Sequence, residues 1–188
     1  MRNLRKNILG LCLAGMGLGV GAAAQAATGV GPYYAMPSWN QTLPAATRFI
    51  VLTNMNSQAV LDRETGLVWA QSPEGRNSWV GAQFNCNQRN LGGRKGWRLP
   101  GIQELASLLD PAHTVGPNSG PALPPGHPFA NVFAAGEQAY WSADTVVGFA
   151  FDAWVVRFGS GNVGRLVKTE DDGAFVWCVR GGQGTATH

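Results

Sequence analysis

The sequence predicts an α+β domain in which two helices pack on short antiparallel sheets beside a long loop region. Three observations lead to this fold class. Short apolar runs are bounded by turn residues, two segments carry apolar residues at helical spacing, and one stretch is dense in proline and glycine. An N-terminal segment of different character precedes all of them.

The N-terminus has the features of an export signal. Three basic residues precede an apolar run over residues 8–20, and small residues then end at Ala26, an order typical of a cleavable secretory signal peptide. The run is rich in glycine and alanine and is shorter than the roughly 20 strongly apolar residues that a transmembrane helix needs, which disfavours a membrane anchor. A lipid attachment at Cys12 is disfavoured because the cysteine follows bulky Leu11 early in the run. We therefore expect residues 1–26 to be removed and the protein to be periplasmic or secreted.

Removal of the signal changes the charge of the chain. Three of the 14 basic residues lie within residues 1–26 and none of the 11 acidic ones does, so the mature chain has a formal net charge of zero. A long-range attraction to nucleic acid or to an anionic membrane needs a net positive field, and we expect neither as a partner. We expect residues 27–47 to form an extended leader, residues 48–181 the folded domain and residues 182–188 a disordered tail.

Two cysteines remain in the mature chain, Cys86 and Cys178. An even number of cysteines in an exported protein favours one disulfide between them. Closing so long a loop stabilises the fold by about 4 to 5 kcal/mol in the chain-entropy model. The alternative is a pair of buried thiols, which an oxidising compartment disfavours. A metal site is disfavoured too, because neither cysteine has another Cys or His at ligand spacing.

Short apolar runs between turn residues predict the strands. Residues 49–52 form one strand and residues 59–70 a hairpin, in which Gly66 supplies the permissive turn backbone. The strands predicted for the last third are residues 139–143, 150–158, 163–168 and 175–180. A turn over residues 159–162 joins the two middle strands in a hairpin, and Cys178 falls in the final strand.

Two helices are predicted between these groups of strands. Asn77 or Ser78 can cap the first helix, which ends at the glycine pair 92–93. Its inward face is formed by Trp79, Ala82 and Cys86. The second helix begins near Pro100 and stops before Pro111. Its apolar face is formed by Ile102, Leu105, Leu108 and Leu109.

A long loop follows the second helix. Six prolines and three glycines fall within residues 111–128, a composition that excludes regular structure and predicts a surface loop. Long loops often carry function, and we give equal weight to the alternative that this one is a tolerated insertion.

Five short motifs occur in a characteristic order. They are Asp62-x-x-Thr65-Gly66-Leu67-x-Trp69, Trp79-x-x-Ala82-x-x-x-Cys86, Gly96-Trp97-Arg98-Leu99-Pro100-x-x-x-Glu104-Leu105, Tyr140-Trp141-Ser142 and Cys178-Val179-Arg180. In this order the motifs resemble the Lcl C-terminal domain family, which is named for a collagen-like adhesin of Legionella. The resemblance covers roughly residues 48–181.

The resemblance implies a C-type-lectin-like fold, related to the domain of the formylglycine-generating enzyme, in exported bacterial proteins. The adhesin that gives the family its name is associated with sulfated glycosaminoglycans. This chain has no collagen-like Gly-X-Y repeat, so the multivalent stalk of that adhesin does not carry over.

One dense basic cluster lies between the two helices and contains Arg89, Arg94, Lys95 and Arg98. Guanidinium groups suit the sulfates or carboxylates of an acidic glycan, and we take Arg94, Lys95 and Arg98 as candidate ligand-binding residues. The alternative is that Arg98 is a structural hydrogen-bond donor and that the others are solvated, which the general surface preference of charged residues favours. Six tryptophans fall in predicted core elements, so most of them should be structural: Trp69, Trp79, Trp97, Trp141, Trp154 and Trp177.

Trp141 and Asp144 are two further candidates for ligand binding. The stretch from Trp141 to Asp144 resembles the place where calcium-dependent lectins hold a metal ligand, and Glu170, Asp171 and Asp172 could supply further oxygens. Those lectins also use a carboxylate-Pro-Asn element, which this sequence lacks. We therefore expect no metal and no cofactor, with a solvated acidic turn at residues 170–172, and keep calcium as the alternative.

These observations favour an exported binding module over an enzyme. We expect it to recognise a polysaccharide, anionic or sulfated glycans included, or a cell-envelope protein, through the loop region around residues 111–144. One alternative is a divergent enzyme of the formylglycine-generating type, but such relatives use a redox-active cysteine pair and the only pair here is assigned to the disulfide. Another is an envelope assembly protein with no small ligand. We expect no catalytic residue, since no nucleophile motif or phosphate-binding loop is present.

Overall fold

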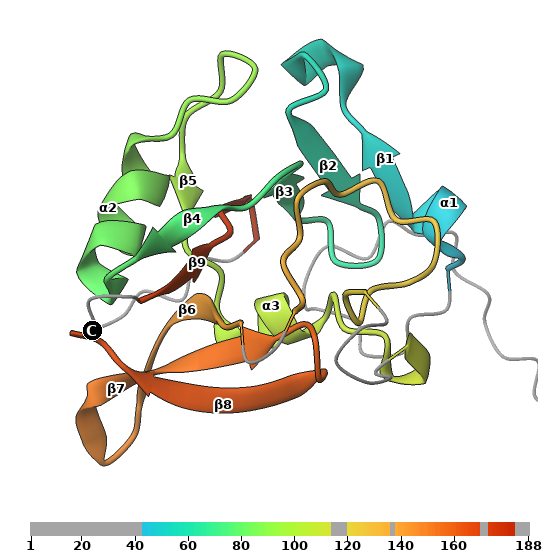
Figure 1. Ribbon diagram of the computed structural model, residues 1–188. Coiled ribbons are helices and arrows are strands. Elements are labelled where there is room, and N and C mark those ends of the chain that lie inside the picture. The colour runs from blue at the N-terminus through green and yellow to red at the C-terminus, as the bar shows by residue number, and fades with distance from the viewer. Residues whose placement is uncertain (1–42, 114–119, 136–137, 170–172, 183–188) are drawn as a thin grey trace, which may run out of the picture. The chain divides into compact units, whose positions relative to one another are not determined.

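The described part of the chain is an α+β domain, as predicted. The computed structural model describes residues 43–113, 120–135, 138–169 and 173–182 (Figure 1). These residues form two five-stranded sheets and a few short helices. Residues 1–42 and 183–188, which include the predicted signal, most of the leader and most of the tail, lie outside the described residues.

The first sheet is antiparallel and has the strand order β1-β2-β3-β10-β5. Its strands are β1 (Phe49–Val51), β2 (Ala59–Asp62), β3 (Val68–Ala70), β10 (Val179–Arg180) and β5 (Trp97–Arg98). The predicted hairpin over residues 59–70 is confirmed, because β2 pairs with β3 in antiparallel register. Gly66 in its turn has a φ of 70°, which glycine adopts without strain.

The second sheet has the strand order β4-β9-β6-β7-β8. Its strands are β4 (Glu74–Asn77), β9 (Ala174–Val176), β6 (Tyr140–Val146), β7 (Phe149–Arg157) and β8 (Asn162–Val167). β6 runs parallel to β9, and the other pairs are antiparallel. The predicted hairpin through residues 159–162 is confirmed, and β7 and β8 pair without a register shift. In Figure 1 the turn between β6 and β7 projects at the lower left.

The final strand differs from the prediction. Residues 175–180 do not form one strand, because the chain leaves the second sheet after Val176 and enters the first sheet at Val179. The backbone oxygen of Cys178 accepts a hydrogen bond from Ala70 N at 2.9 Å, one residue before β10 begins. Cys178 therefore lies at the junction of the two sheets and not within a strand.

Both predicted helices exist and both are shorter than expected. α2 (Trp79–Gln88) begins at the Ser78 cap, whose Oγ accepts from Gly81 N at 3.2 Å, but it ends before the glycine pair 92–93. α3 (Ile102–Ala106) ends early because the Ser107 hydroxyl bonds back to Glu104 O at 2.7 Å and the chain turns away. Leu108 is nevertheless fully buried, as the prediction required.

Two segments predicted to be irregular contribute to the core. Of the leader, residues 43–47 are described, and they do not stay extended, because a single helical turn forms at α1 (Ala45–Arg48). In the proline-rich loop, residues 114–119 lie outside the described residues, and Ala122 and Leu123 are buried at 0 % and 2 % exposure. The Ala122 amide donates to Phe158 O, so this stretch packs against the domain and is not a pure surface loop.

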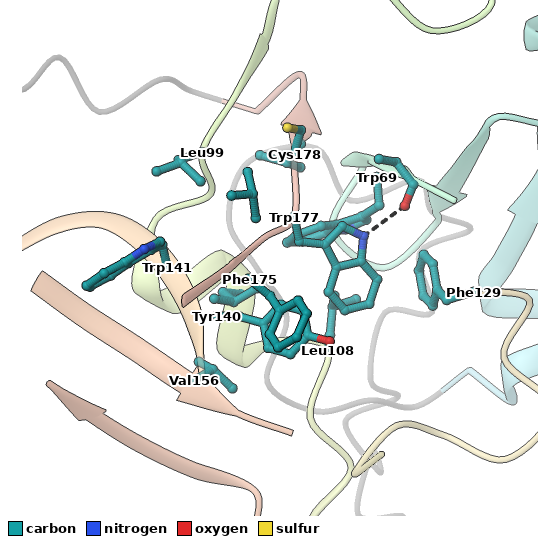
Figure 2. Close-up of a cluster of buried hydrophobic side chains, with 14 of the residues drawn as sticks. Trp69, Leu99, Leu108, Phe129, Tyr140, Trp141, Val156, Phe175, Trp177 and Cys178 are labelled. Atoms are coloured by element: carbon teal, nitrogen blue, oxygen red, sulfur yellow. Dashed lines mark hydrogen bonds between the residues drawn. The ribbon is translucent and has the colours of Figure 1, made fainter. Parts of the chain in front are cut away.

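Aromatic side chains dominate the core, and Trp177 lies at its centre (Figure 2). Its ring centroid is 5.0 Å from that of Phe129, 5.4 Å from Phe158 and 5.8 Å from both Trp69 and Tyr140. The Trp177 indole N–H donates to Ala70 O at 2.8 Å. Such aromatic pairs contribute about 0.5–1.5 kcal/mol each beyond the area that they bury.

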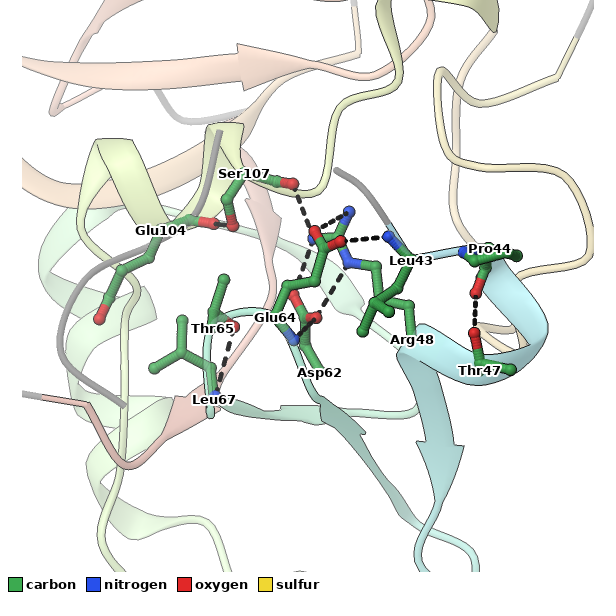
Figure 3. Close-up of polar contacts among 10 residues, drawn as sticks. All are labelled: Leu43, Pro44, Thr47, Arg48, Asp62, Glu64, Thr65, Leu67, Glu104 and Ser107. Atoms are coloured by element: carbon green, nitrogen blue, oxygen red, sulfur yellow. Dashed lines mark hydrogen bonds and ion pairs between the residues drawn. The ribbon is translucent and has the colours of Figure 1, made fainter. Parts of the chain in front are cut away.

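A buried ionic cluster ties the first described residues to the domain (Figure 3). Arg48 is fully buried and binds Asp62 through two hydrogen bonds of 2.9 and 2.8 Å. The same guanidinium donates to Ser107 O at 2.9 Å and lies 3.6 Å from the Glu64 carboxylate. Glu64 in turn accepts from Leu43 N at 2.5 Å. The cluster therefore joins α1, the turn after β2 and the end of α3.

Candidate binding surface

The predicted disulfide is confirmed and is structural. Cys86 and Cys178 form a bond with an S–S distance of 2.04 Å, and both residues are buried. The bond joins the last turn of α2 to the junction of the two sheets. It closes a loop of 92 residues, which contains most of the described domain.

Three of the predicted ligand-binding residues make structural contacts. Arg98 forms two hydrogen bonds of 2.7 Å with Glu104 and donates to Gly181 O at 2.8 Å. Trp141 is 0 % exposed, and its indole N–H donates to Asn77 O at 2.8 Å. Asp144 accepts from Ile102 N at 2.5 Å and so caps the start of α3. We therefore leave these three residues out of the candidate surface.

Arg94 and Lys95 lie in an exposed turn between α2 and β5. Within the described residues neither side chain has a hydrogen bond or an ion pair, although the Lys95 carbonyl accepts from Arg180 Nε at 2.8 Å. Arg89, the other basic residue before this turn, forms an ion pair with Glu74. The structure thus keeps two of the four predicted basic residues available to solvent.

The residues proposed for calcium are not brought together in the described part of the chain. Residues 170–172 lie outside the described residues, and Asp144 is engaged at the start of α3. No group of three or more His, Cys, Asp or Glu side chains that could hold a metal occurs among the described residues.

Three large apolar side chains that are exposed to solvent lie together at the turn between β6 and β7. Val147 is 94 % exposed, Phe151 78 % and Phe149 53 %. The turn consists of Val147 and Gly148, and a φ of 81° at the glycine makes so short a connection possible. Thr145, Val146 and Ala150 line an open depression of about 440 Å³ together with the two turn residues. A turn that only faces solvent has no use for large apolar side chains, so this group of them marks a candidate interaction surface.

The outer part of β7 and β8 extends this apolar region. Arg165 on β8 lies directly opposite Trp154 on β7, so both side chains lie on one face of the sheet. The Arg165 guanidinium lies 4.1 Å from the centre of the Phe149 ring and 3.6 Å from Asp152, which places both on that face. Val163 and Val167, at 46 % and 42 % exposure, share the face by alternation along β8.

We call this region the distal surface. It consists of the exposed apolar groups at the projecting end of the strand pair, Val147, Phe149 and Phe151, and of one face of β7 and β8, with Asp152, Trp154, Val163, Arg165 and Val167. By alternation Phe151, which neighbours Asp152, points to the opposite face, so the apolar surface wraps around the end of the strand pair. Lys168 supports it from the other side of the sheet, where its ammonium donates to Thr145 Oγ1 on β6 and Ala150 O on β7 at 2.8 Å each. The Lys168 ammonium lies 4.2 Å from the centre of the Trp79 ring. These contacts hold β7 and β8 in place, so the exposed apolar side chains lie on a well-supported pair of strands.

Sequence patterns did not single out this surface, because strand-forming apolar residues look the same whether they face the core or solvent. Trp154 was assigned to the core and is half-buried, whereas four of the other tryptophans are fully buried as predicted. The signal that was present is the Val-Gly turn followed by two phenylalanines, since turns normally carry polar residues.

None of the helices in the described residues is long and apolar enough to cross a membrane.

Two comparisons with known proteins bear on the family of the domain. The search of curated proteins found no match for this chain. The sequence model of the Lcl C-terminal domain matches residues 58–180, which is well over half of the chain. The five ordered motifs lie within or directly beside this range, and the chain therefore belongs to the Lcl C-terminal domain family.

Proposed function

We propose that this protein is an exported binding module that recognises a protein partner of the cell envelope through the distal surface. The observation that carries the proposal is the exposure of Val147, Phe149 and Phe151 at one projecting turn. Contiguous apolar groups of this size are costly to leave in water and typically mark interaction sites. We propose no catalytic activity and no cofactor.

The composition of the distal surface favours a protein over a sugar as the ligand. Protein interfaces are enriched in aromatic residues and arginine, and the surface combines Phe149, Phe151 and Trp154 with Arg165. Sugars stack on flat aromatic rings, but the flanking valines offer them neither a ring face nor a hydrogen bond. Valines do contribute to an interface that excludes water around aromatic residues.

Export and the C-type-lectin-like arrangement are parts of the same proposal. The disulfide supports an oxidising compartment, in keeping with a signal peptide over residues 1–26. The C-type-lectin-like arrangement rests on family membership and on the α+β architecture with two short helices. The proposed contact surface lies just after residues 111–144, the region that the sequence favoured.

Site-specific photocrosslinking in the producing cell tests the proposal. A photoreactive phenylalanine analogue replaces Phe151 in one variant and Phe84 in a control variant. Phe84 is a suitable control because it is also a phenylalanine and is 63 % exposed, but it lies on α2. We expect a discrete crosslinked species from position 151 and none from position 84.

The crosslinked protein is then identified by mass spectrometry, purified and mixed with the purified domain. The double variant Phe149→Ser with Phe151→Ser should bind it at least tenfold more weakly, whereas Phe84→Ser should bind as the natural chain does. Equal crosslinking at both positions, or full binding by the double variant, would refute the distal surface as the contact site.

An anionic polysaccharide is a second candidate ligand, and one observation favours it. Arg94 and Lys95 are exposed and have no side-chain partner within the described residues. Heparin binding, measured at several salt concentrations, should weaken and lose part of its salt dependence in the variant Arg94→Ser with Lys95→Ser. Unchanged heparin affinity in that variant would remove the basic turn from consideration.

A further inference from the structure

We propose that the partner docks by adding an extended segment to β8 as a further strand, and that this segment alternates apolar, acidic and apolar residues. The inference rests on the proposed function, because it specifies how the distal surface holds a protein. It is carried by three features of β8: its place in the sheet, the direction of its backbone groups and its charge.

β8 is the terminal strand of the second sheet, and no described strand pairs with its outer side. Natural edge strands are protected by proline, a bulge, charged side chains or short length. β8 has six residues, no proline and no register shift, and its one charged side chain is Arg165, which repels a positive partner and attracts an acidic one. The opposite edge strand, β4, does have a register shift. Among the described edges, β8 is therefore the one left open to pairing along several residues.

The backbone groups that face outward can be identified from one hydrogen bond. Lys168 N donates to Phe151 O at 2.8 Å, so these two residues form a hydrogen-bonded pair of the antiparallel ladder. Every second pair along the ladder is then hydrogen-bonded. The pairs between them, which include those of Val163, Arg165 and Val167, are not. The N–H and C=O groups of these three residues consequently point away from β7, toward an incoming strand.

The same three residues carry the exposed side chains of β8. A strand paired with β8 would therefore place its own side chains directly opposite Val163, Arg165 and Val167, where cross-strand pairs interact most strongly. Apolar groups opposite the two valines would cover side chains that are 46 % and 42 % exposed. The backbone and the side chains of β8 thus specify one register.

Charge determines what lies opposite Arg165. The Arg165 side chain is 50 % exposed and lies 3.6 Å from Asp152, which is an open contact and not a close ion pair. A second copy of this chain is disfavoured as the partner, because the two-fold register that pairs Val163 with Val167 places Arg165 opposite Arg165. An acidic residue at that position is favourable, so the segment belongs to a different protein.

A synthetic heptapeptide supplies the test. It has threonine at its odd positions and valine, glutamate and valine at its even positions, so the order is the same in either strand direction. The chain purified after export, labelled with nitrogen-15, is titrated with this peptide and followed by NMR. We expect shift changes and slower amide exchange at Val163, Arg165 and Val167.

Two N-methylated peptides provide the matched control. N-methyl groups on the two valines and the glutamate remove the donors that would face β8 and should weaken binding at least tenfold. N-methyl groups on the threonines at positions 3, 5 and 7 alter the far edge and should leave binding within about twofold. Equal binding of both methylated peptides, or shifts centred on Arg94 and Lys95, would overturn strand addition.

Variants of the protein separate this inference from the proposed function. Val167→Pro removes one outward N–H and leaves the ladder to β7 intact, whereas Val167→Thr keeps the N–H as its control. We expect the proline variant to bind the peptide at least tenfold more weakly and the threonine variant to bind within about threefold. If Phe149→Ser with Phe151→Ser abolishes partner binding while Val167→Pro does not affect it, the distal surface stands and strand addition is refuted. Concentration-dependent dimers that Val167→Pro abolishes would also refute it, because the occupant would then be a second copy.

Discussion

Replacement of Arg48 by methionine should destabilise the domain more than any other single change at a charged residue of the described chain. Methionine fills a similar volume but cannot bond to Asp62, Ser107 O or Glu64. Arg48 and these three partners are all buried, so the change removes the one cation from the cluster and leaves two carboxylates without a cation in the interior.

The size of the expected loss of stability depends on which partners of Arg48 stay buried after the substitution. Removing one member of a buried ion pair costs about 3–5 kcal/mol, because the other charge loses its compensation without regaining water. That is a large share of the roughly 5–15 kcal/mol by which domains are stable. It corresponds to a fall in melting temperature of about 6–20 °C for a chain of this length. Glu64 keeps the Leu43 amide as a donor, which limits the loss.

Urea unfolding followed by tryptophan fluorescence, with the disulfide intact, measures the change. Arg89→Met is the matched control, because its ion pair with Glu74 is partly exposed and should contribute only about 0–1 kcal/mol. The double variant Arg48→Met with Asp62→Leu should recover about 2–3 kcal/mol of the sum of the single losses, since it removes a stranded charge. A free energy of unfolding that falls by less than about 1 kcal/mol in Arg48→Met would contradict this expectation, as would strictly additive losses in the double variant. Either result would show that the cluster does not stabilise the fold as its geometry indicates.

Three further predictions concern the core. Cys86→Ser with Cys178→Ser should lower the free energy of unfolding by about 4–5 kcal/mol through the 92-residue loop, measured by urea unfolding against the oxidised chain. Trp177→Ala should cost about 3–5 kcal/mol and abolish the near-ultraviolet circular dichroism of the aromatic cluster. Burial raises the pKa of Tyr140 well above its ordinary value of 10.0, so the folded state keeps a proton that the unfolded chain loses. The free energy of unfolding should therefore fall as pH rises above about 10, and less steeply in Tyr140→Phe.

The elements that sequence predicted best are those with a strong local pattern. The Ser78 cap, the Gly66 turn and the hairpin through residues 159–162 each depend on residues a few positions apart, and all are present. The disulfide was predictable from cysteine count and compartment alone. The division of residues 175–180 between two sheets was not, because the choice depends on Ala70, which is more than a hundred residues away.

The candidate surface was least predictable for the same reason. Arg98, Trp141 and Asp144 had residue types that suit ligands, yet each has a long-range structural partner that local spacing does not reveal. Conversely, Phe149 and Phe151 fit a buried strand, and their exposure follows from the position of the β6–β7 turn beyond the covered part of the sheet. Local patterns report which residues can pack, whereas the topology decides which of them do.

The stability of the disulfide-closed core compensates for the apolar side chains that the distal surface leaves exposed. Leaving Val147, Phe149 and Phe151 in water forgoes stabilisation that their burial would contribute, at about 1.5–3 kcal/mol for each large side chain. The disulfide, at about 4–5 kcal/mol, offsets a large part of that loss, and it acts on the unfolded chain without needing any contact at the β6–β7 turn. Substitutions on the distal surface should therefore change affinity with little effect on folding, whereas substitutions at Arg48 or Trp177 should do the reverse. A protein that uses its core in this way can keep an apolar surface ready for a partner and remain folded before the partner arrives.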